Sequence, residues 1–183
     1  MRAVSETTLL PLLALTLAGC TAGRLSQLER TLAGGDSATA ALGNWCAARG
    51  LADPPRIVAR RVRGEDAPLP SDARALLDIR PGTAPDYRHV RLNCGNVTLS
   101  EAHNWFVTSR LTPEMNATLA ATDKPFGTVI APLHFTRERL ATSRTRAEGC
   151  PPGTVLSHRA VLRLPDGRPI SLVVECYQQG ALR

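Results

Sequence analysis

The sequence predicts an α+β protein in which an antiparallel β-sheet is flanked by helices. Residues 87–107 read "YRHVRLN", "CGNVT" and "LSEAHNWFV", an alternating strand, a turn and a returning strand. Residues 156–177 repeat this pattern, with "LSHRAVLRL" and "ISLVVECY" joined by Asp166-Gly167, which supplies the positive φ of a tight turn. Between the hairpins, Thr112 and Pro113 are typical of a helix start. A helix that follows one hairpin and precedes another is expected to pack on their sheet.

The segment before the first hairpin predicts a short helix and a strand. In "TAALGNWCAARGL", residues 39–51, Leu42, Trp45 and Cys46 lie at helical spacing, and Gly50 with the following prolines ends the helix. "RIVARRVRG", residues 56–64, alternates as a strand, and "SDARALLDI", residues 71–79, predicts a helical turn.

After the first hairpin, Met115 and Leu119 give the helix that begins at Pro113 an apolar side. "DKPFGTVIAP", residues 123–132, interrupts the pattern with Pro125 and Gly127. "HFTRERLATSRTR", residues 134–146, fits a strand and a helix equally.

Composition indicates one domain and excludes several functions. The 183 residues are 43% hydrophobic, 21% charged and 4% aromatic, which suits one domain with a modest core. The net charge is +6, yet no block of basic residues with interleaved aromatics indicates a nucleic-acid surface. Walker, G-x-G-x-x-G and G-x-S-x-G motifs are absent, and no cofactor is predicted.

The N-terminus indicates export. An apolar run at residues 9–19 follows Arg2 and leads into "LAGC", which resembles a bacterial lipobox. The resemblance implies a signal peptide at 1–19, a lipidated Cys20 and a lipid anchor in the cell envelope, facing the periplasm. Residues 20–38, rich in Ala, Gly, Ser and Thr, are predicted to be a flexible tether, and residues 39–183 the folded domain. The alternatives are a misassigned start codon and an uncleaved hydrophobic tail.

Export changes the meaning of the other cysteines, which are Cys46, Cys94, Cys150 and Cys176. Four cysteines in an oxidising compartment favour disulfides, with three connectivities, of which we favour Cys46–Cys94 and Cys150–Cys176. Without export, four reduced and buried thiols are the alternative.

No metal site is predicted. The chain has no C-x-x-C, and its histidines lack HExxH-like spacing, so all four are interpreted as surface or hydrogen-bonded core residues, namely His89, His103, His134 and His158.

Glu175 interrupts an apolar strand. It follows Leu172, Val173 and Val174, and the strand alternation puts it on one face with Val173 and Tyr177. A charge that faces an apolar core costs several kcal/mol unless it is paired. Glu175 therefore either has a chemical role in a functional site or is a charged residue on an edge strand, where it discourages aggregation.

Three stretches in this order resemble the main blocks of the chorismate lyase family. They are "YRHVRLNCGNVTLSEAHNWFVTSRLT", "DKPFGTVI" and "LRLPDGRPISLVVECY". The resemblance implies an antiparallel sheet with flanking helices that enclose a ligand cavity, a fold related to the UTRA domains of transcription regulators.

The resemblance also implies a site. Arg88, next to Tyr87, would bind the ligand carboxylate through two parallel hydrogen bonds from its planar guanidinium. If the strand register differs, Arg91 is the alternative residue for this role. The backbone of Pro125, Phe126 and Gly127 would meet the same carboxylate, and Glu175 would face the cavity. The early segment that closes the family's cavity is matched loosely by Asn44, Trp45 and Cys46.

Three functions are compatible with these sequence features. The first is a lyase that eliminates pyruvate from chorismate to give 4-hydroxybenzoate, with Glu175 and Arg88 as catalytic residues and no cofactor or metal. The second is an envelope lipoprotein that binds a small aromatic carboxylate without turnover. The third is a structural lipoprotein with a filled core. The expected partners are an aromatic carboxylate and, through the lipid anchor, a membrane, with no nucleic acid, and the protein is expected to be a monomer.

Overall fold

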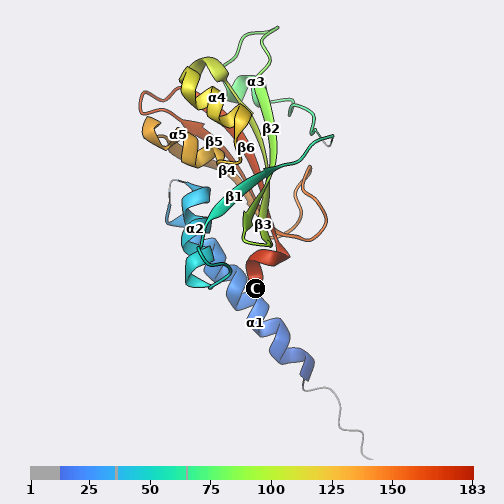
Figure 1. Ribbon diagram of the computed structural model, residues 1–183. Coiled ribbons are helices and arrows are strands. Elements are labelled where there is room, and N and C mark those ends of the chain that lie inside the picture. Colours follow the sequence, from blue (N-terminus) through green and yellow to red (C-terminus); the bar gives the residue numbers. More distant parts are fainter. Residues whose placement is uncertain (1–12, 36, 65) are drawn as a thin grey trace, which may run out of the picture.

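A six-stranded antiparallel sheet forms the protein, with α1, α2, α4 and α5 on one face and the short helix α3 on the other (Figure 1). The computed structural model describes residues 13–35, 37–64 and 66–183, with side chains from Thr21 onward. The strand order is β1-β2-β3-β6-β5-β4, and the strands are β1 Ile57–Arg61, β2 Asp86–Cys94, β3 Val97–Phe106, β4 Thr136–Ser143, β5 Thr154–Arg163 and β6 Pro169–Gln178. The helices are α1 Leu13–Ala33, α2 Ala38–Ala48, α3 Ala73–Leu76, α4 Pro113–Ala121 and α5 Phe126–Ile130, with 3-10 turns η1 Thr108–Arg110, η2 Ala131–Leu133 and η3 Gln179–Leu182. The predicted fold class is confirmed.

Both predicted hairpins are present. β2 pairs with β3, β5 pairs with β6, and the two hairpins join through an antiparallel β3–β6 pairing in the centre of the sheet. Gly167 has φ +85° in the second turn, a backbone conformation that glycine adopts without steric cost. Thr112 caps α4 by accepting a hydrogen bond from the Met115 amide.

The sheet has two differently covered faces. The helical face carries Val90, Val173, Glu175 and Tyr177 and packs under α1, α2, α4 and α5. The loop face carries His103, Trp105, Val174 and Cys176 and packs under residues 66–79, which include α3, and residues 147–150. Side chains of consecutive strand residues point to opposite faces. Of any two consecutive residues on β3 or β6, one therefore lies on the helical face and the other on the loop face.

The predicted flexible tether is wrong for most of its length. Residues 21–33 are helical within α1, and Leu28 and Leu32 are fully buried in the core with α2 and the sheet. Arg144 binds Glu29 through two hydrogen bonds of 2.8 and 2.7 Å, so α1 is also tied to the end of β4. The folded body therefore begins before Thr39. The signal peptide predicted at 1–19 lies outside the residues whose side chains are described.

Other segments resolve as expected or in more detail. The ambiguous residues 134–146 form the edge strand β4, and the interruption at 123–132 contains the short helix α5. α2 begins at Ala38, with the Ser37 hydroxyl accepting from the Ala40 amide. None of the helices in the described part of the chain has the length and apolar character to cross a bilayer.

The ends of the domain are fixed by long-range contacts. The Trp45 indole donates to the carbonyl of Ala181 at 2.9 Å, which joins α2 to η3. Disulfides join Cys46 to Cys94 and Cys150 to Cys176, the pairing favoured from the sequence. The first links α2 to the end of β2, and the second links the loop before β5 to β6.

Candidate functional site

Glu175 lies in the interior of the protein. β6 is flanked by β3 and β5, so it is not an edge strand, and Glu175 is only 8% exposed. The interpretation of Glu175 as an edge-strand charge is therefore wrong. Its side chain shares the helical face with Val173 and Tyr177, as the alternation predicts.

Arg137 on β4 is the ion-pair partner of Glu175. Its Nη2 donates to Oε2 of Glu175, and the Tyr177 hydroxyl donates to the same oxygen at 2.9 Å. Although burial favours the neutral form, the adjacent Glu175 outweighs burial and raises the pKa of Arg137. Arg137 could not be predicted as a site residue, because residues 134–146 have no clear strand period.

Arg88 on β2 is a buried cation that has no carboxylate bonded to it among the residues that the structure describes. It is 2% exposed, and its Nη2 donates to the Thr122 carbonyl at 3.0 Å. Within the described residues, its Nε and Nη1 have no hydrogen-bond partner. Burial, with a contribution from nearby Arg61, lowers the pKa of Arg88 to about 10. A buried guanidinium with two donor nitrogens unpartnered among the described residues is costly, because such groups have lost water without gaining a protein partner there.

Arg88 and Glu175 share the helical face but do not touch. Arg88 lies opposite Asn104, which lies opposite Val173, so Glu175 is two strands and two residues away. Strand spacing and rise place the two Cα atoms roughly 12 Å apart. Arg137, not Arg88, contacts Glu175.

A small pocket of about 40 Å³ adjoins Glu175. Phe126, Gly127, Asn104 and Arg137 also line it, whereas Arg88 does not. The structure therefore brings the predicted Phe126, Gly127 and Glu175 together and leaves Arg88 beside this group, across Asn104.

The first turn of α2 covers the pocket. A Cβ atom on Gly127 would lie 2.8 Å from the Ser37 hydroxyl and 3.1 Å from the Thr39 hydroxyl, so the absence of a side chain permits this contact. Trp45 and Cys46 do not line the pocket, because they are engaged with Ala181 and Cys94. A further hollow of about 340 Å³, lined by Gly34, Gly35 and Arg139 among others, lies against Arg137.

His158 completes the buried polar group on the helical face. It lies directly opposite Glu175 on β5, and its ring meets the Tyr177 ring edge-on at 5.1 Å. Burial, followed by the positive charges of Arg137 and Arg139, lowers the pKa of His158 to about 3. It is therefore neutral at physiological pH.

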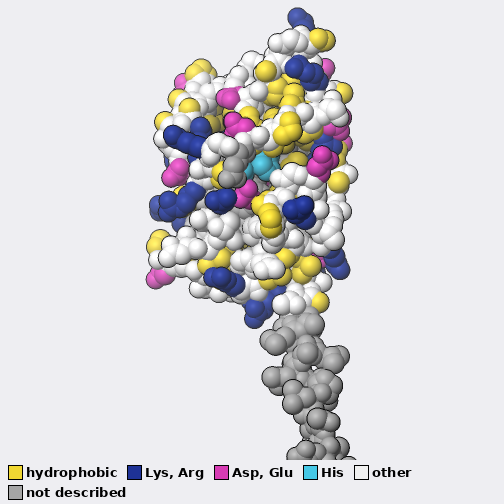
Figure 2. All heavy atoms as spheres, turned by 90° about the vertical axis from the view of Figure 1, so that its right-hand side faces the viewer, with side chains coloured by type: hydrophobic (Ala, Val, Ile, Leu, Met, Phe, Trp, Pro, Cys, Tyr) yellow, Lys and Arg dark blue, Asp and Glu magenta, His cyan; other side chains and the backbone are white. Residues whose placement is uncertain are grey.

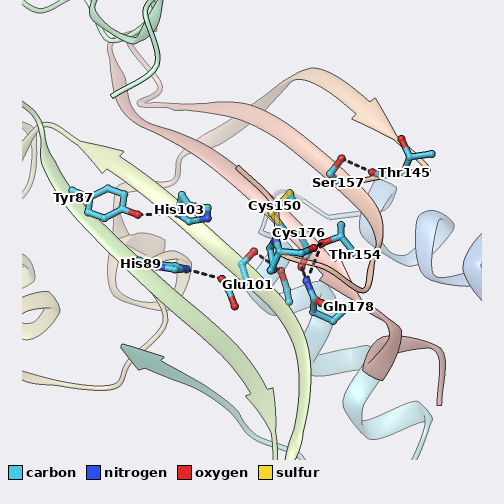
Figure 3. The surroundings of a disulfide bond; sticks show 12 residues. Tyr87, His89, Glu101, His103, Thr145, Cys150, Thr154, Ser157, Cys176 and Gln178 are labelled. Carbon is cyan, nitrogen blue, oxygen red and sulfur yellow. Dashed lines mark hydrogen bonds and ion pairs between the residues drawn. A yellow bond between two sulfur atoms is a disulfide. The ribbon is translucent and has the colours of Figure 1, made fainter. Parts of the chain in front are cut away.

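The loop face holds a second buried polar cluster (Figure 3). His89 and Glu101 are joined at 2.8 Å, and the Tyr87 hydroxyl contacts Nδ1 of His103 at 2.8 Å. Although burial raises the pKa of Glu101, hydrogen bonds from Arg91 and His89 outweigh it, and the net shift is downward. Burial and the neighbouring His89 lower the pKa of His103 to about 4.

A cavity of about 620 Å³ lies over this face and is lined by His103, Trp105 and Val174 together with residues of the two covering loops. Figure 2 looks onto this side of the molecule and shows histidine at its centre, surrounded by apolar and charged side chains. His89, His103 and His158 are buried, whereas His134 is exposed.

The fold is that of the UTRA effector domains of GntR-family regulators. The effector domain of PhnF from Mycobacterium smegmatis superposes with a TM-score of 0.54 at 16% identity, covering 78% of this chain and 88% of that one. The ligand-binding domain of a GntR-family regulator from Bordetella bronchiseptica superposes with a TM-score of 0.43 at 16% identity, covering 67% of this chain and 81% of its own. No protein-family model matches the sequence.

A sequence relative defines the family within this fold. The uncharacterized protein y4mC of Sinorhizobium fredii is 42% identical over 177 residues, covering 86% of this chain and 75% of the relative. The chain belongs to the family of that protein.

Proposed function

We propose that the protein binds a small organic carboxylate, an aromatic carboxylate such as 4-hydroxybenzoate, on the helical face without converting it. The observation that carries this proposal is Arg88, a guanidinium 2% exposed with Nε and Nη1 unpartnered among the described residues. A carboxylate is the complementary group, because its negative charge pairs with a guanidinium and its oxygens accept hydrogen bonds from N–H donors that lack a partner.

The local charge supports an anionic ligand. Arg88 is buried in this region, the side chain of Arg137 is 4% exposed, and Glu175 is bonded to Arg137. Arg88 receives electrostatic support from Asp123, but that residue is exposed and forms no bond to it among those described. A monoanionic ligand would supply the charge that Arg88 lacks and would satisfy donors that otherwise remain desolvated.

Ligand entry would require local movement. The 40 Å³ pocket beside Glu175 has room for a water-sized group and not for an aromatic ring. The first turn of α2 rests on Gly127 at the pocket, and Arg137, which lines the pocket, also lines the hollow at Gly34 and Gly35. We therefore expect the ligand to displace the start of α2 and to enter from this side.

A chorismate lyase is the second candidate, favoured by the buried Glu175 on the returning strand. Two observations favour binding over elimination. Oε2 of Glu175 already accepts hydrogen bonds from Arg137 and Tyr177, which stabilise it as an acceptor. Glu175 and Arg88 are also separated by the width of two strands. A lyase acting here would have to rearrange both residues around its substrate.

We further propose that the protein is a monomeric envelope lipoprotein, lipidated at Cys20 and facing the periplasm. The "LAGC" pattern and the paired cysteines support this cellular location, because disulfides persist in oxidising compartments. Since residues 21–33 are helical and packed, the anchor would lie close to the folded body.

The test combines binding with turnover. Calorimetric titration of the full chain in detergent with 4-hydroxybenzoate should show binding that Arg88→Gln weakens about 30-fold or more. Arg60→Gln, which removes an exposed arginine on β1, is the matched control and should leave affinity unchanged. Pyruvate release from chorismate should be absent. Release that disappears in Glu175→Gln would establish the lyase instead, and absence of both signals would leave a structural role.

A further inference from the structure

Three buried side chains on the loop face have the chemistry of metal ligands. They are His89 on β2 and Glu101 and His103 on β3, and one potential ligand atom from each lies within 4.8 Å of the others. We propose that these residues bind one divalent transition-metal ion of the zinc type. The site lies on the opposite face of the sheet from Arg88 and Glu175, so it is independent of the proposed carboxylate site.

The hairpin places the three residues together. His89 lies directly opposite His103, and Glu101 is two residues from His103 on the same strand, so all three side chains leave the same face. The His89 and His103 rings are 4.2 Å apart between their centroids. Zinc ligands lie about 2.0–2.2 Å from the metal, so only modest side-chain movement would be needed to close the site.

His103 provides an independent indication of a ligand. It is 4% exposed, its Nδ1 contacts the Tyr87 hydroxyl, and its Nε2 has no hydrogen-bond partner among the described residues. The Gly149 backbone approaches the ring, but no hydrogen bond of ordinary geometry reaches Nε2. Buried polar atoms are nearly always paired, so an orphaned imidazole nitrogen needs an explanation. A metal bound at Nε2 would supply its partner.

Surrounding contacts are those expected to orient metal ligands. Tyr87, which holds Nδ1 of His103, is itself fixed by a 2.9 Å hydrogen bond from the Ala67 amide. The second carboxylate oxygen of Glu101 accepts from Nε of Arg91 at 2.8 Å. Such outer contacts fix the ring orientation and ligand geometry at metal centres. The 2.8 Å contact between His89 and Glu101 would give way to two bonds to the metal.

The ligand set selects the kind of metal. Two imidazoles and one carboxylate suit zinc and neighbouring transition metals, whereas calcium and magnesium prefer oxygen ligands alone. Three protein ligands also leave a coordination position for water or a ligand. His103 lines the 620 Å³ cavity, which provides room for that additional group. The site would therefore be suited to binding a metal-coordinating small molecule.

Metal titration of the full-length chain tests the proposal. The protein, purified in detergent and treated with a chelator, is titrated with Zn²⁺ by calorimetry and with Co²⁺ by visible absorption. We expect one ion per chain and a Co²⁺ spectrum of nitrogen and oxygen ligation. His103→Gln and Glu101→Gln should weaken Zn²⁺ binding at least 100-fold, and Tyr87→Phe should weaken it about 10-fold through lost orientation.

Two histidine variants serve as controls. His134→Gln removes an exposed histidine, and His158→Gln removes a buried histidine from the helical face. Both should retain wild-type Zn²⁺ affinity and stoichiometry. A wild-type chain that binds no Zn²⁺ would overturn the proposal irrespective of how the variants fold. Unchanged affinity in folded His103→Gln would do the same.

Discussion

The buried guanidinium of Arg137 on β4 is bonded to the carboxylate of Glu175 on β6, across the intervening strand β5. Tyr177 donates to the same carboxylate oxygen, so the pair belongs to a network under the helices. This ion pair joins the edge strand of the sheet to its centre by a side-chain contact.

Removing one member of this pair should be more harmful than removing both. Arg137→Met leaves Glu175 buried without its cation, and we expect a loss of about 3–5 kcal/mol of unfolding free energy. Adding Glu175→Gln should restore a substantial part of that loss, because no unpaired charge remains. Urea denaturation of the two single variants and the double variant measures the coupling. Strictly additive losses would show that the pair does not act as a unit.

Gly180 should tolerate no side chain. A Cβ atom there would lie 2.3 Å from the carbonyl oxygen of Thr98, a backbone atom that cannot rotate away. Gly180→Ala should therefore destabilise the protein by about 1–3 kcal/mol. Gly43→Ala is the matched control, because it lies inside α2 with no atom within 4 Å of the added Cβ, and it should stabilise by about 0.5–1 kcal/mol. Equal effects of the two substitutions on thermal unfolding would refute this packing.

Buried neutral histidines should make the protein less stable in acid. The pKa of His158 is lowered to about 3 in the folded state, below the ordinary value of 6.5, so the unfolded chain takes up its proton first. Stability is therefore fully present above about pH 6.5 and decreases toward pH 3, by up to ~1.4 kcal/mol per pH unit for this group. His158→Gln should flatten part of the pH dependence of urea midpoints. His134→Gln, at an exposed position, should leave that dependence unchanged, and an unaltered slope in His158→Gln would contradict the argument.

The Cys150–Cys176 disulfide should stabilise the loop that covers the cavity. The two cysteines are 26 residues apart, so their bond restricts a substantial loop in the unfolded chain. Replacing both by serine should cost about 2–4 kcal/mol. Protein isolated from the envelope should show no free thiol at Cys46, Cys94, Cys150 and Cys176. Four freely titrating thiols would contradict both the disulfides and the proposed location in the cell envelope.

The hairpins could be predicted because their signals are local. Alternation along 87–107, the Asp166-Gly167 turn and the Thr112 cap each determine structure within a few residues. The face of Glu175 also follows from strand alternation alone. These features required no knowledge of distant partners.

The missed features depend on contacts between distant segments. The composition of 20–38 suggested a tether, but Leu28 and Leu32 become helical once a sheet and α2 bury them. Arg137 lies in a segment with no clear period, and only the order of strands brings it to Glu175. His89 and His103 lack the spacing of a helical metal motif, yet the hairpin register places them opposite each other.

The claim that Arg88 binds a ligand carboxylate is tested most directly by removing the carboxylate and the arginine in turn. Affinities of 4-hydroxybenzoate and 4-hydroxybenzyl alcohol are measured by calorimetry on the wild-type chain and on Arg88→Gln. We predict that the wild type prefers the carboxylate by about 30-fold or more, roughly 2 kcal/mol, and that Arg88→Gln loses most of this preference. A preference of the same size in both proteins, or none in the wild type, would contradict the account.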